Sequence, residues 1–228
     1  MALLSDWRPT TLKLADGREF HVRHAWCVGR NYAEHAREMG SDPSRSDPVF
    51  FSKPASAIVQ ADTVEWPPAT EDLHHEAELV VFLGAGGRDL SAQQAAGCVF
   101  GYAVGCDLTR RDVQARAKAA GMPWALSKGF DQSGPVGLIV QADAWRPDEN
   151  REIRLEVGGE IRQRAVLGDK IWPVAELLSR LSHEVTLHPG DAVFTGTPAG
   201  VSGLAVGDGV VVGIDGLPEL RFEIVPRR

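Results

Sequence analysis

The chain has 228 residues, 43% of them hydrophobic, and a formal net charge of −7 at pH 7. This length suits one domain with a sizeable core, and an acidic chain without a long basic run is a poor partner for nucleic acid or an anionic membrane. No stretch approaches the roughly 20 apolar residues that span a bilayer, and the N-terminus lacks the pattern of a signal peptide. Cys27, Cys98 and Cys106 lie in apolar stretches, so we expect reduced thiols in a cytoplasmic protein.

The first elements expected along the chain are a hairpin, a strand and a helix. Residues 11–22 predict a β-hairpin around the turn Asp16-Gly17. A strand over 25–29 then leads into a helix over 31–40, for which Asn31 is the expected N-terminal cap.

The middle of the chain predicts further short strands and helices. A loop rich in Ser, Asp and Pro is expected over residues 41–48 and an apolar run over 49–54. A buried strand over 75–83 is followed by a short helix over 91–96. A second strand over 101–107 and a second helix over 110–120 come next. Thr109 is the expected cap of the last helix, and Gly121 its end.

Beyond about Pro123, short β-like runs alternate with Gly and Pro turns, and only residues 174–181 predict a helix. The strands are expected over 154–157, 160–162, 192–195, 210–212 and 220–224. This pattern predicts a mostly β fold with a few short helices, built as a barrel or as folded-over sheets. We expect a single domain over residues 1–228, with a small N-terminal hairpin at about 1–24.

Two glutamates in the strand expected over 75–83, and Asp107 after the next apolar run, are candidate metal ligands. Because side chains alternate faces along a strand, Glu76 and Glu78 point the same way. Neighbouring carboxylates in an apolar strand are costly unless they are protonated or share a cation. All-oxygen ligation favours a hard ion such as Mg²⁺. A solvent-facing acidic stripe, with Asp107 as an ordinary helix cap, is the alternative interpretation.

His35 and Glu38 share one face of the first expected helix, because they are three residues apart. A histidine beside a carboxylate makes a general base, since the glutamate orients and supports the imidazolium that forms when the ring takes a proton from water. An exposed helix with two solvated side chains is the alternative interpretation.

Other polar groups suit an anionic, oxygen-rich ligand. Arg111 and Gln114 share a face of the helix expected over 110–120 and offer a cationic fork and an amide. Thr197, in a Gly- and Pro-rich loop, can hydrogen-bond a carboxylate. Lys53 and Lys128 are lone cations in apolar or Gly-rich stretches, and together with Arg30 they concentrate positive charge near the candidate site of this acidic protein.

Six blocks, in order along nearly the whole chain, carry a family resemblance. They read GRNYAEHAREM from Gly29, FSKP from Phe51, LHHEAEL from Leu73, DLTRRDVQ from Asp107, SKGFD from Ser127 and TGTPAGV from Thr195. These blocks resemble the fumarylacetoacetate hydrolase family, and within it the short acylpyruvate and fumarylpyruvate hydrolases.

The resemblance implies a mixed β-roll like the C-terminal domain of that family, a homodimer, and a place in aromatic catabolism. It also implies a Mg²⁺ or Mn²⁺ ion held by Glu76, Glu78 and Asp107, and a water-activating dyad of His35 and Glu38. The residues that it implies around the substrate are Lys128, as a catalytic group, with Arg111, Gln114 and Thr197.

The chain departs from the family pattern at three places. Ala77 replaces a larger aliphatic residue between the two glutamates, Lys170 stands where relatives usually carry an apolar residue, and the loop after Val201 is short. We expect the last two to alter the mouth of the pocket, and with it the choice of substrate.

The reaction expected from the resemblance is hydrolysis of the C–C bond of a 2,4-dioxo acid, fumarylpyruvate or another acylpyruvate, to pyruvate and a carboxylic acid. Decarboxylation of oxaloacetate and isomerisation of a carboxymethyl-hydroxymuconate-type compound are alternatives on the same scaffold. A non-catalytic 2-oxo-acid binding protein is a further alternative, although it has no need of the pair His35 and Glu38.

Overall fold

The computed structural model describes residues 8–38 and 47–228, with only the backbone at Ala36 and Glu38. Its largest element is a six-stranded sheet, in which one pair of neighbouring strands is parallel and the others are antiparallel. The strands lie in the order β12 (Val140–Gln141), β9 (Val99–Cys106), β8 (Ala77–Leu83), β15 (Asp191–Phe194), β3 (His24–Gly29) and β4 (Val49–Lys53), with β15 and β3 parallel.

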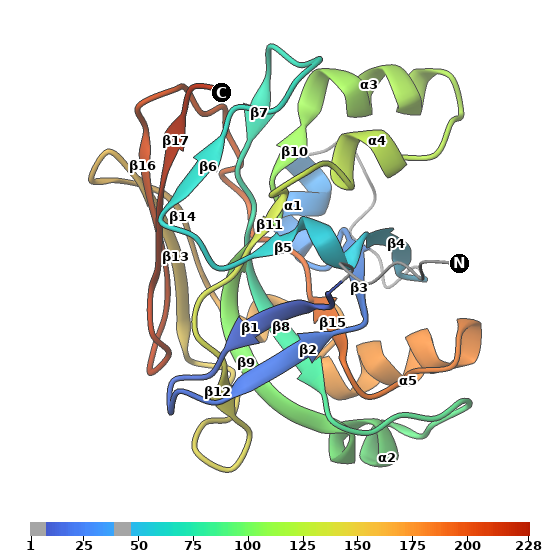
Figure 1. The fold of residues 1–228 in the computed structure, drawn as a ribbon. Helices are drawn as coiled ribbons and strands as arrows, with labels where there is room; N and C mark the ends of the chain where they lie inside the picture. Colours follow the sequence, from blue (N-terminus) through green and yellow to red (C-terminus); the bar gives the residue numbers. More distant parts are fainter. Residues whose placement is uncertain (1–7, 39–46) are drawn as a thin grey trace, which may run out of the picture.

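A second sheet of five strands packs against the first and stands at the left of Figure 1, beside β8 and β9. Its strands lie in the order β14 (Glu160–Val166), β13 (Glu152–Val157), β16 (Gly209–Ile214), β17 (Leu220–Val225) and β6 (Thr63–Glu65). Buried residues alternate with more exposed ones along β13 and β17. One face of this sheet therefore forms the main core with the larger sheet.

The other face of the six-stranded sheet is also covered. The hairpin of β1 (Thr10–Lys13) and β2 (Glu19–Val22) packs there, with Leu12 and Phe20 in a second cluster that includes Val80 and Phe194. Burial on both faces explains why β8 is apolar at nearly every position. The two remaining ladders are β7 (Leu73–His74) with β10 (Thr109–Arg110), and β5 (Ile58–Val59) with β11 (Gly134–Pro135).

The helices are short; four of them lie in two pairs at opposite ends of the molecule, and α1 lies between the pairs. In Figure 1, α3 and α4 lie at the top, and α2 and α5 pack together at the bottom. Ser91 and Gln94 form a reciprocal capping box at the start of α2. The bounds are α1 (Ala33–Glu38), α2 (Ala92–Gly97), α3 (Arg111–Ala119), α4 (Ala125–Lys128) and α5 (Val174–Glu184), with single 3₁₀ turns at Ala55–Ala57 and Leu167–Asp169.

The structure confirms the mostly β fold with a few short helices, and in the described part of the chain both large sheets are open, not closed into a barrel. The hairpin around Asp16-Gly17 is confirmed, as are three free, buried cysteines. No helix in the two described segments is long and apolar enough to cross a membrane. The loop expected over 41–48 lies, up to residue 46, outside the described residues.

Two predicted helix caps are wrong. Helix α1 begins at Ala33, and the Asn31 side chain instead donates to the carbonyl oxygens of Thr195 and Trp172. Helix α3 begins at Arg111, and Thr109 lies in β10. In both cases a buried polar side chain serves a contact between distant segments, which local sequence does not reveal.

Candidate active site

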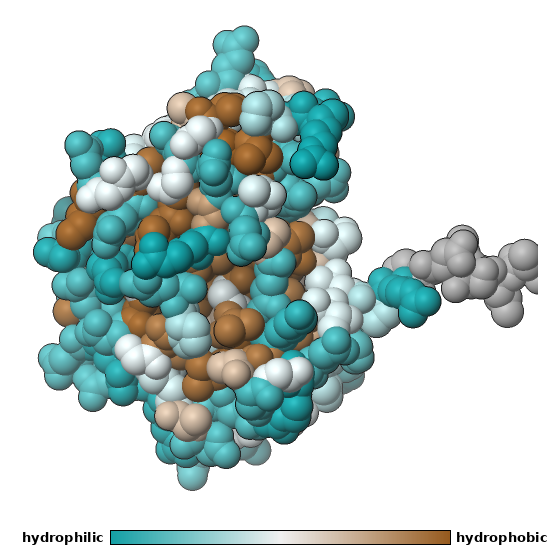
Figure 2. All heavy atoms as spheres, turned by 60° about the vertical axis from the view of Figure 1, so that its left-hand side comes forward, coloured by the Kyte–Doolittle hydropathy of each residue, from teal (hydrophilic) through white to brown (hydrophobic). Residues whose placement is uncertain are grey.

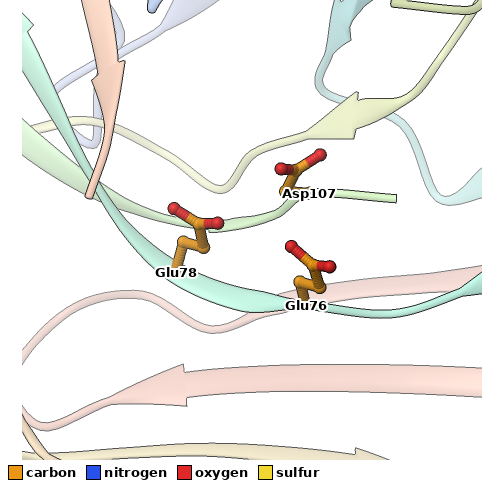
Figure 3. Close-up of side chains that lie close together, drawn as sticks. All are labelled: Glu76, Glu78 and Asp107. Atoms are coloured by element: carbon orange, nitrogen blue, oxygen red, sulfur yellow. The ribbon is translucent and has the colours of Figure 1, made fainter. Parts of the chain in front are cut away.

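Three carboxylates converge where β8 and β9 run side by side. Glu78 lies in β8, Glu76 just before it and Asp107 just after β9, and the Asp107 backbone N–H donates to the Glu76 carbonyl at 2.8 Å. This antiparallel pairing brings one oxygen of each carboxylate within 4.8 Å of the others. Figure 3 shows the three side chains turned toward a common space. All three are buried, so the exposed acidic stripe is excluded.

Lys128, at the end of α4, binds two of these carboxylates. Its Nζ donates to Glu76 Oε2 at 2.8 Å, to Asp107 Oδ2 at 2.7 Å and to the Thr109 hydroxyl at 2.7 Å. Arg111 Nη2 donates to the other Glu76 oxygen at 2.6 Å and Arg111 Nη1 to Gln114 Oε1 at 2.6 Å. The ends of α3 and α4 therefore supply the countercharge of the carboxylates.

Lys53, at the end of β4, reaches the cluster from the opposite side. Its Nζ lies 2.8 Å from Asp107 Oδ1, and neither side chain is exposed. The same ammonium donates to the Ser133 hydroxyl at 3.0 Å and to the Lys128 carbonyl. Asp107 Oδ1 nevertheless accepts no well-formed hydrogen bond from the described residues.

The two glutamates differ in their protonation behaviour. Burial alone would raise the pKa of Glu76, but Lys128 and Arg111 outweigh it and hold that pKa well below its usual range. Burial, reinforced by Asp107 and Glu76, raises the pKa of Glu78 well above its usual value. The pKa of Lys128 is raised, because its two carboxylates outweigh the effect of burial. Lys128 therefore keeps its charge at neutral pH.

The cluster fits a divalent metal ion. It offers three carboxylates with all-oxygen donors, the set that Mg²⁺ and Mn²⁺ prefer. Asp107 Oδ1 is buried and accepts no hydrogen bond among the described residues, and Glu78 Oε2 accepts one at 2.5 Å, from the Gly196 N–H. The number, spacing and donor type of these carboxylate oxygens therefore suit a divalent ion.

Gly196 allows the loop after β15 to approach Glu78. Its φ is +93°, and a Cβ there would lie 2.7 Å from the Asn31 Cβ, so a larger residue would be both strained and crowded. The backbone of this loop therefore comes within hydrogen-bond distance of the Glu78 carboxylate. The next residue, Thr197, is buried and lines the pocket.

One pocket opens onto the cluster and brings together most of the predicted site residues. Its cavity volume is about 30 Å³, enough for one or two water molecules. His35, only 6% exposed, lines it together with Glu76. The other predicted residues in its wall are Arg30, Arg111, Gln114, Lys128 and Thr197.

Four predicted residues do not line this pocket in the described structure: Glu38, Lys53, Glu78 and Asp107. Glu78 and Asp107 belong to the carboxylate cluster, of which Glu76 reaches the pocket wall. Lys53 was expected to contact substrate, but its ammonium is fully buried against Asp107 and backbone carbonyls, so it supports a candidate ligand instead. The side chain of Glu38 lies outside the described residues, although its backbone closes α1 on the helix that carries His35.

Lys170 does not shape this pocket. Among the described residues it borders a separate cavity beside α5, and its Nζ lies 5.1 Å from the centre of the Tyr32 ring. The expectation that Lys170 lies at the mouth of this pocket is therefore wrong, because its side chain is buried in the interior of the protein.

Sequence reasoning missed several residues of the site. Lys118 lines the pocket, and positions 111, 114 and 118 lie on one face of α3, a periodicity that would have revealed it. Phe51 and Trp124 also line the pocket, as do Val28 and Gly29. Gln163, buried in β14, donates to Thr197 Oγ1 at 2.8 Å and accepts from the Ala77 N–H at 3.0 Å. No local pattern in β14 signals that role.

Comparison with known proteins identifies the family. The sequence profile of the fumarylacetoacetate (FAA) hydrolase C-terminal family matches residues 24–225. The chain belongs to this family. The fumarylacetoacetate hydrolase-like fold is shared with a fumarylpyruvate hydrolase from Pseudomonas aeruginosa, solved in complex with Mn²⁺ and pyruvate, at 44% identity and a TM-score of 0.96 with complete coverage of both chains.

Curated relatives of this fumarylacetoacetate hydrolase family member carry other activities. Oxaloacetate tautomerase FAHD1 of Arabidopsis thaliana, a mitochondrial protein, is 41% identical over 202 residues, which cover 88% of this chain and 90% of the relative. The mitochondrial oxaloacetate decarboxylase of Dictyostelium discoideum is 38% identical over 204 residues, covering 88% and 93%. The protein is thus an enzyme of this family, and its relatives span more than one reaction.

Proposed function

We propose that this protein is a divalent-metal-dependent hydrolase that cleaves the C–C bond of a 2,4-dioxo acid, fumarylpyruvate or another acylpyruvate, to pyruvate and a carboxylic acid. The observation that carries the proposal is one pocket in which a buried histidine faces an all-oxygen carboxylate cluster and a charged lysine. The Pseudomonas aeruginosa fumarylpyruvate hydrolase, similar over the whole chain, holds Mn²⁺ and pyruvate.

Glu76, Glu78 and Asp107 would hold Mg²⁺ or Mn²⁺, which when bound supplies Lewis-acid polarisation of the substrate oxygens. His35, supported by Glu38, takes a proton from a water molecule, and the resulting hydroxide attacks the acyl carbonyl of the substrate. The bond between that carbon and the neighbouring methylene breaks, and its electron pair passes to the pyruvate fragment. The ammonium of Lys128 stabilises the negative oxygen that develops there. The resulting enolate takes up the proton that His35 removed from water, which gives pyruvate and restores the neutral imidazole.

The remaining pocket residues orient the substrate in this proposal. Arg111 and Gln114, already joined by a hydrogen bond of 2.6 Å, present donors to the 2-oxo acid end. Thr197 offers a hydroxyl from the loop after β15. Lys53 holds Asp107 in place from behind the cluster.

A second candidate is tautomerisation or decarboxylation of oxaloacetate, which the names of the relatives at 41% and 38% identity favour. Both start from a 2-oxo acid that the same carboxylate cluster and Lys128 would bind. Neither consumes a water molecule, so a water-activating role of His35 separates hydrolysis from both. Isomerisation of a carboxymethyl-hydroxymuconate-type compound and mere binding of a 2-oxo acid are weaker candidates.

The deciding experiment compares three substrates on metal-stripped protein. Fumarylpyruvate, acetylpyruvate and oxaloacetate are incubated in parallel, Mg²⁺ or Mn²⁺ is added back, and absorbance and pyruvate release are followed. Metal-dependent release of pyruvate from an acylpyruvate, much faster than any change of oxaloacetate, supports hydrolysis. If only oxaloacetate reacts, by enol–keto exchange or by loss of CO₂, the result would contradict hydrolysis and support the second candidate function.

Two variants sharpen this comparison. His35→Ala is expected to lower acylpyruvate hydrolysis by about 10²–10⁴, whereas His183→Ala, an exposed histidine on α5, serves as the matched control. Glu76→Ala is expected to abolish metal-dependent turnover in a folded protein, and retained Mg²⁺-dependent activity in that variant would contradict the ligand assignment.

We also propose that the protein is a homodimer of the cytoplasm that acts in aromatic catabolism, as the family resemblance suggests. Figure 2 shows apolar surface in the middle of one side of the molecule, bordered by hydrophilic residues, and such surface is available for a subunit contact. Sedimentation equilibrium tests this assembly: a mass near twice 24.7 kDa supports it, and a single-chain mass contradicts it.

A further inference from the structure

The pocket has more positive charge than its carboxylates neutralise. Lys128 is paired with Glu76 and Asp107, and Arg111 is paired with Glu76. Arg30 and Lys118 also line the pocket, but neither has a carboxylate partner among the described residues. Two unpaired cations in one opening of a protein with a net charge of −7 require an explanation.

Arg30 and Lys118 lie at the mouth of the pocket, since both are exposed whereas Glu76 and Lys128 are buried. The Lys118 ammonium lies 5.2 Å from the centre of the Trp124 ring, and that ring packs against Gly29, next to Arg30. Although Lys118 is exposed as a whole residue, partial desolvation of its ammonium, followed by the positive charges of Arg111 and Arg30, lowers its pKa. An anion placed between these cations would relieve their repulsion.

The backbone at Arg30 is also unusual. Its φ is +63°, a left-handed conformation that costs free energy in residues other than glycine. Such backbone strain is commonly retained at functional sites. Arg30 directly follows the end of β3 and lines the pocket, and the chain then turns inward at the buried residues Asn31 and Tyr32.

Helix α3 sets the spacing between the two ends of the pocket. Arg111 and Lys118 lie on one face, seven residues apart, so their Cα atoms are separated by roughly 10 Å along the helix. Arg111 contacts the Glu76 carboxylate at the inner end, and Lys118 stands at the outer end. A substrate that spans this face carries one carboxylate at the cluster and a second one near the mouth.

We propose that Lys118 and Arg30 form a subsite for the distal carboxylate of an extended dicarboxylic 2-oxo acid. This inference rests on the proposed function and specifies its substrate class: fumarylpyruvate, with carboxylates at both ends of a seven-carbon chain, in preference to acetylpyruvate, which has one. The shorter oxaloacetate places its two carboxylates too close together to use both ends of α3.

The test uses two unreactive seven-carbon ligands that differ only in the distal carboxylate, 2-oxoheptanedioate and 2-oxoheptanoate. Their affinities for the Mn²⁺-loaded protein are measured by calorimetry. The unmodified protein is expected to bind the dicarboxylate about 10- to 100-fold more tightly, the effect of one charge-assisted contact. Lys118→Met should reduce this preference to about twofold, and Lys118→Arg should retain most of it.

Arg116→Met is the matched control, because it removes one positive charge from the same helix at an exposed position paired with Asp112. It should leave the preference between the two ligands unchanged. An equal affinity of the unmodified protein for the two ligands, or an equal loss for both in Lys118→Met, would overturn the subsite.

Failure of the subsite and failure of the proposed reaction are distinguishable. If the dicarboxylate preference depends on Lys118 but no acylpyruvate is cleaved, the subsite stands and the hydrolase proposal falls. If fumarylpyruvate is cleaved while Lys118→Met leaves the ligand preference intact, the hydrolase proposal stands and the subsite falls.

Discussion

The Lys53 ammonium lies 2.8 Å from Asp107 Oδ1, and neither side chain has any exposed surface. The pair joins the end of β4 to the end of β9, two strands that are not neighbours in the six-stranded sheet. A candidate metal ligand is thus held by a lysine that never reaches the pocket.

Lys53→Met is expected to destabilise the metal-free protein by about 3–5 kcal/mol, because it leaves the buried Asp107 without one of its two cations. The free energy of unfolding is measured in urea with a chelator present. The control is Arg18→Met, which breaks an exposed ion pair with Asp16 and should not shift the urea midpoint. Equal midpoints for Lys53→Met and Arg18→Met would refute a supporting role for Lys53.

Removal of a carboxylate from the cluster should weaken metal binding without unfolding the protein. Glu78→Gln keeps the shape of the side chain and the contact to the Gly196 N–H, but it removes the negative charge. We expect Mn²⁺ affinity, measured by calorimetry, to fall at least about tenfold. Glu34→Gln, exposed on α1, is the control. Undiminished Mn²⁺ binding by Glu78→Gln would remove Glu78 from the ligand set.

Gln163 links Ala77, which lies between the two glutamates, to Thr197 through hydrogen bonds of 3.0 and 2.8 Å. Gln163→Leu should lower kcat/KM for the preferred substrate by about 10- to 100-fold, as for other residues that orient a ligand. Because the two side chains act together, Thr197→Val should lower kcat/KM by a smaller factor in the Gln163→Leu variant than in the unmodified protein. Gln93→Leu, exposed on α2, is the control. Strictly additive losses would argue against this coupling.

Lys170 gives the stability of the protein a pH dependence. Burial lowers the pKa of Lys170 to about 7 in the folded protein, from an ordinary value of 10.5. Between these two values the unfolded chain holds a proton that the folded protein lacks, so stability rises with pH, by at most about 1.4 kcal/mol per pH unit. Below pH 7 both states are protonated and the contribution of Lys170 is constant.

Lys170→Met isolates this contribution. The free energy of unfolding of the two proteins is compared at pH 7, 8 and 9, so that other titrating groups cancel. The variant should be the more stable protein at pH 7, because its side chain carries no charge into the interior, and its advantage should shrink as the pH rises. A difference that stays constant over this range would show that Lys170 keeps its ordinary pKa.

The sequence alone determined the elements whose signals are local. The hairpin around Asp16-Gly17, the buried strand β8 and the helix α5 follow from turn residues and hydrophobic period. The sequence also identified Glu76 and Glu78 as a pair, because side chains two positions apart along a strand lie on the same face. The family resemblance then assembled the remaining residues into one expected site.

Only the tertiary structure decided which polar residues serve the site and which serve the fold. Asn31 and Thr109 had the sequence marks of helix caps, yet they bond segments far away in the chain. Lys53 and Lys128 looked alike as lone cations, but Lys53 is buried behind Asp107 and Lys128 lines the pocket. Such differences depend on which strands become neighbours, and a sequence pattern reports only what lies within a few residues along the chain.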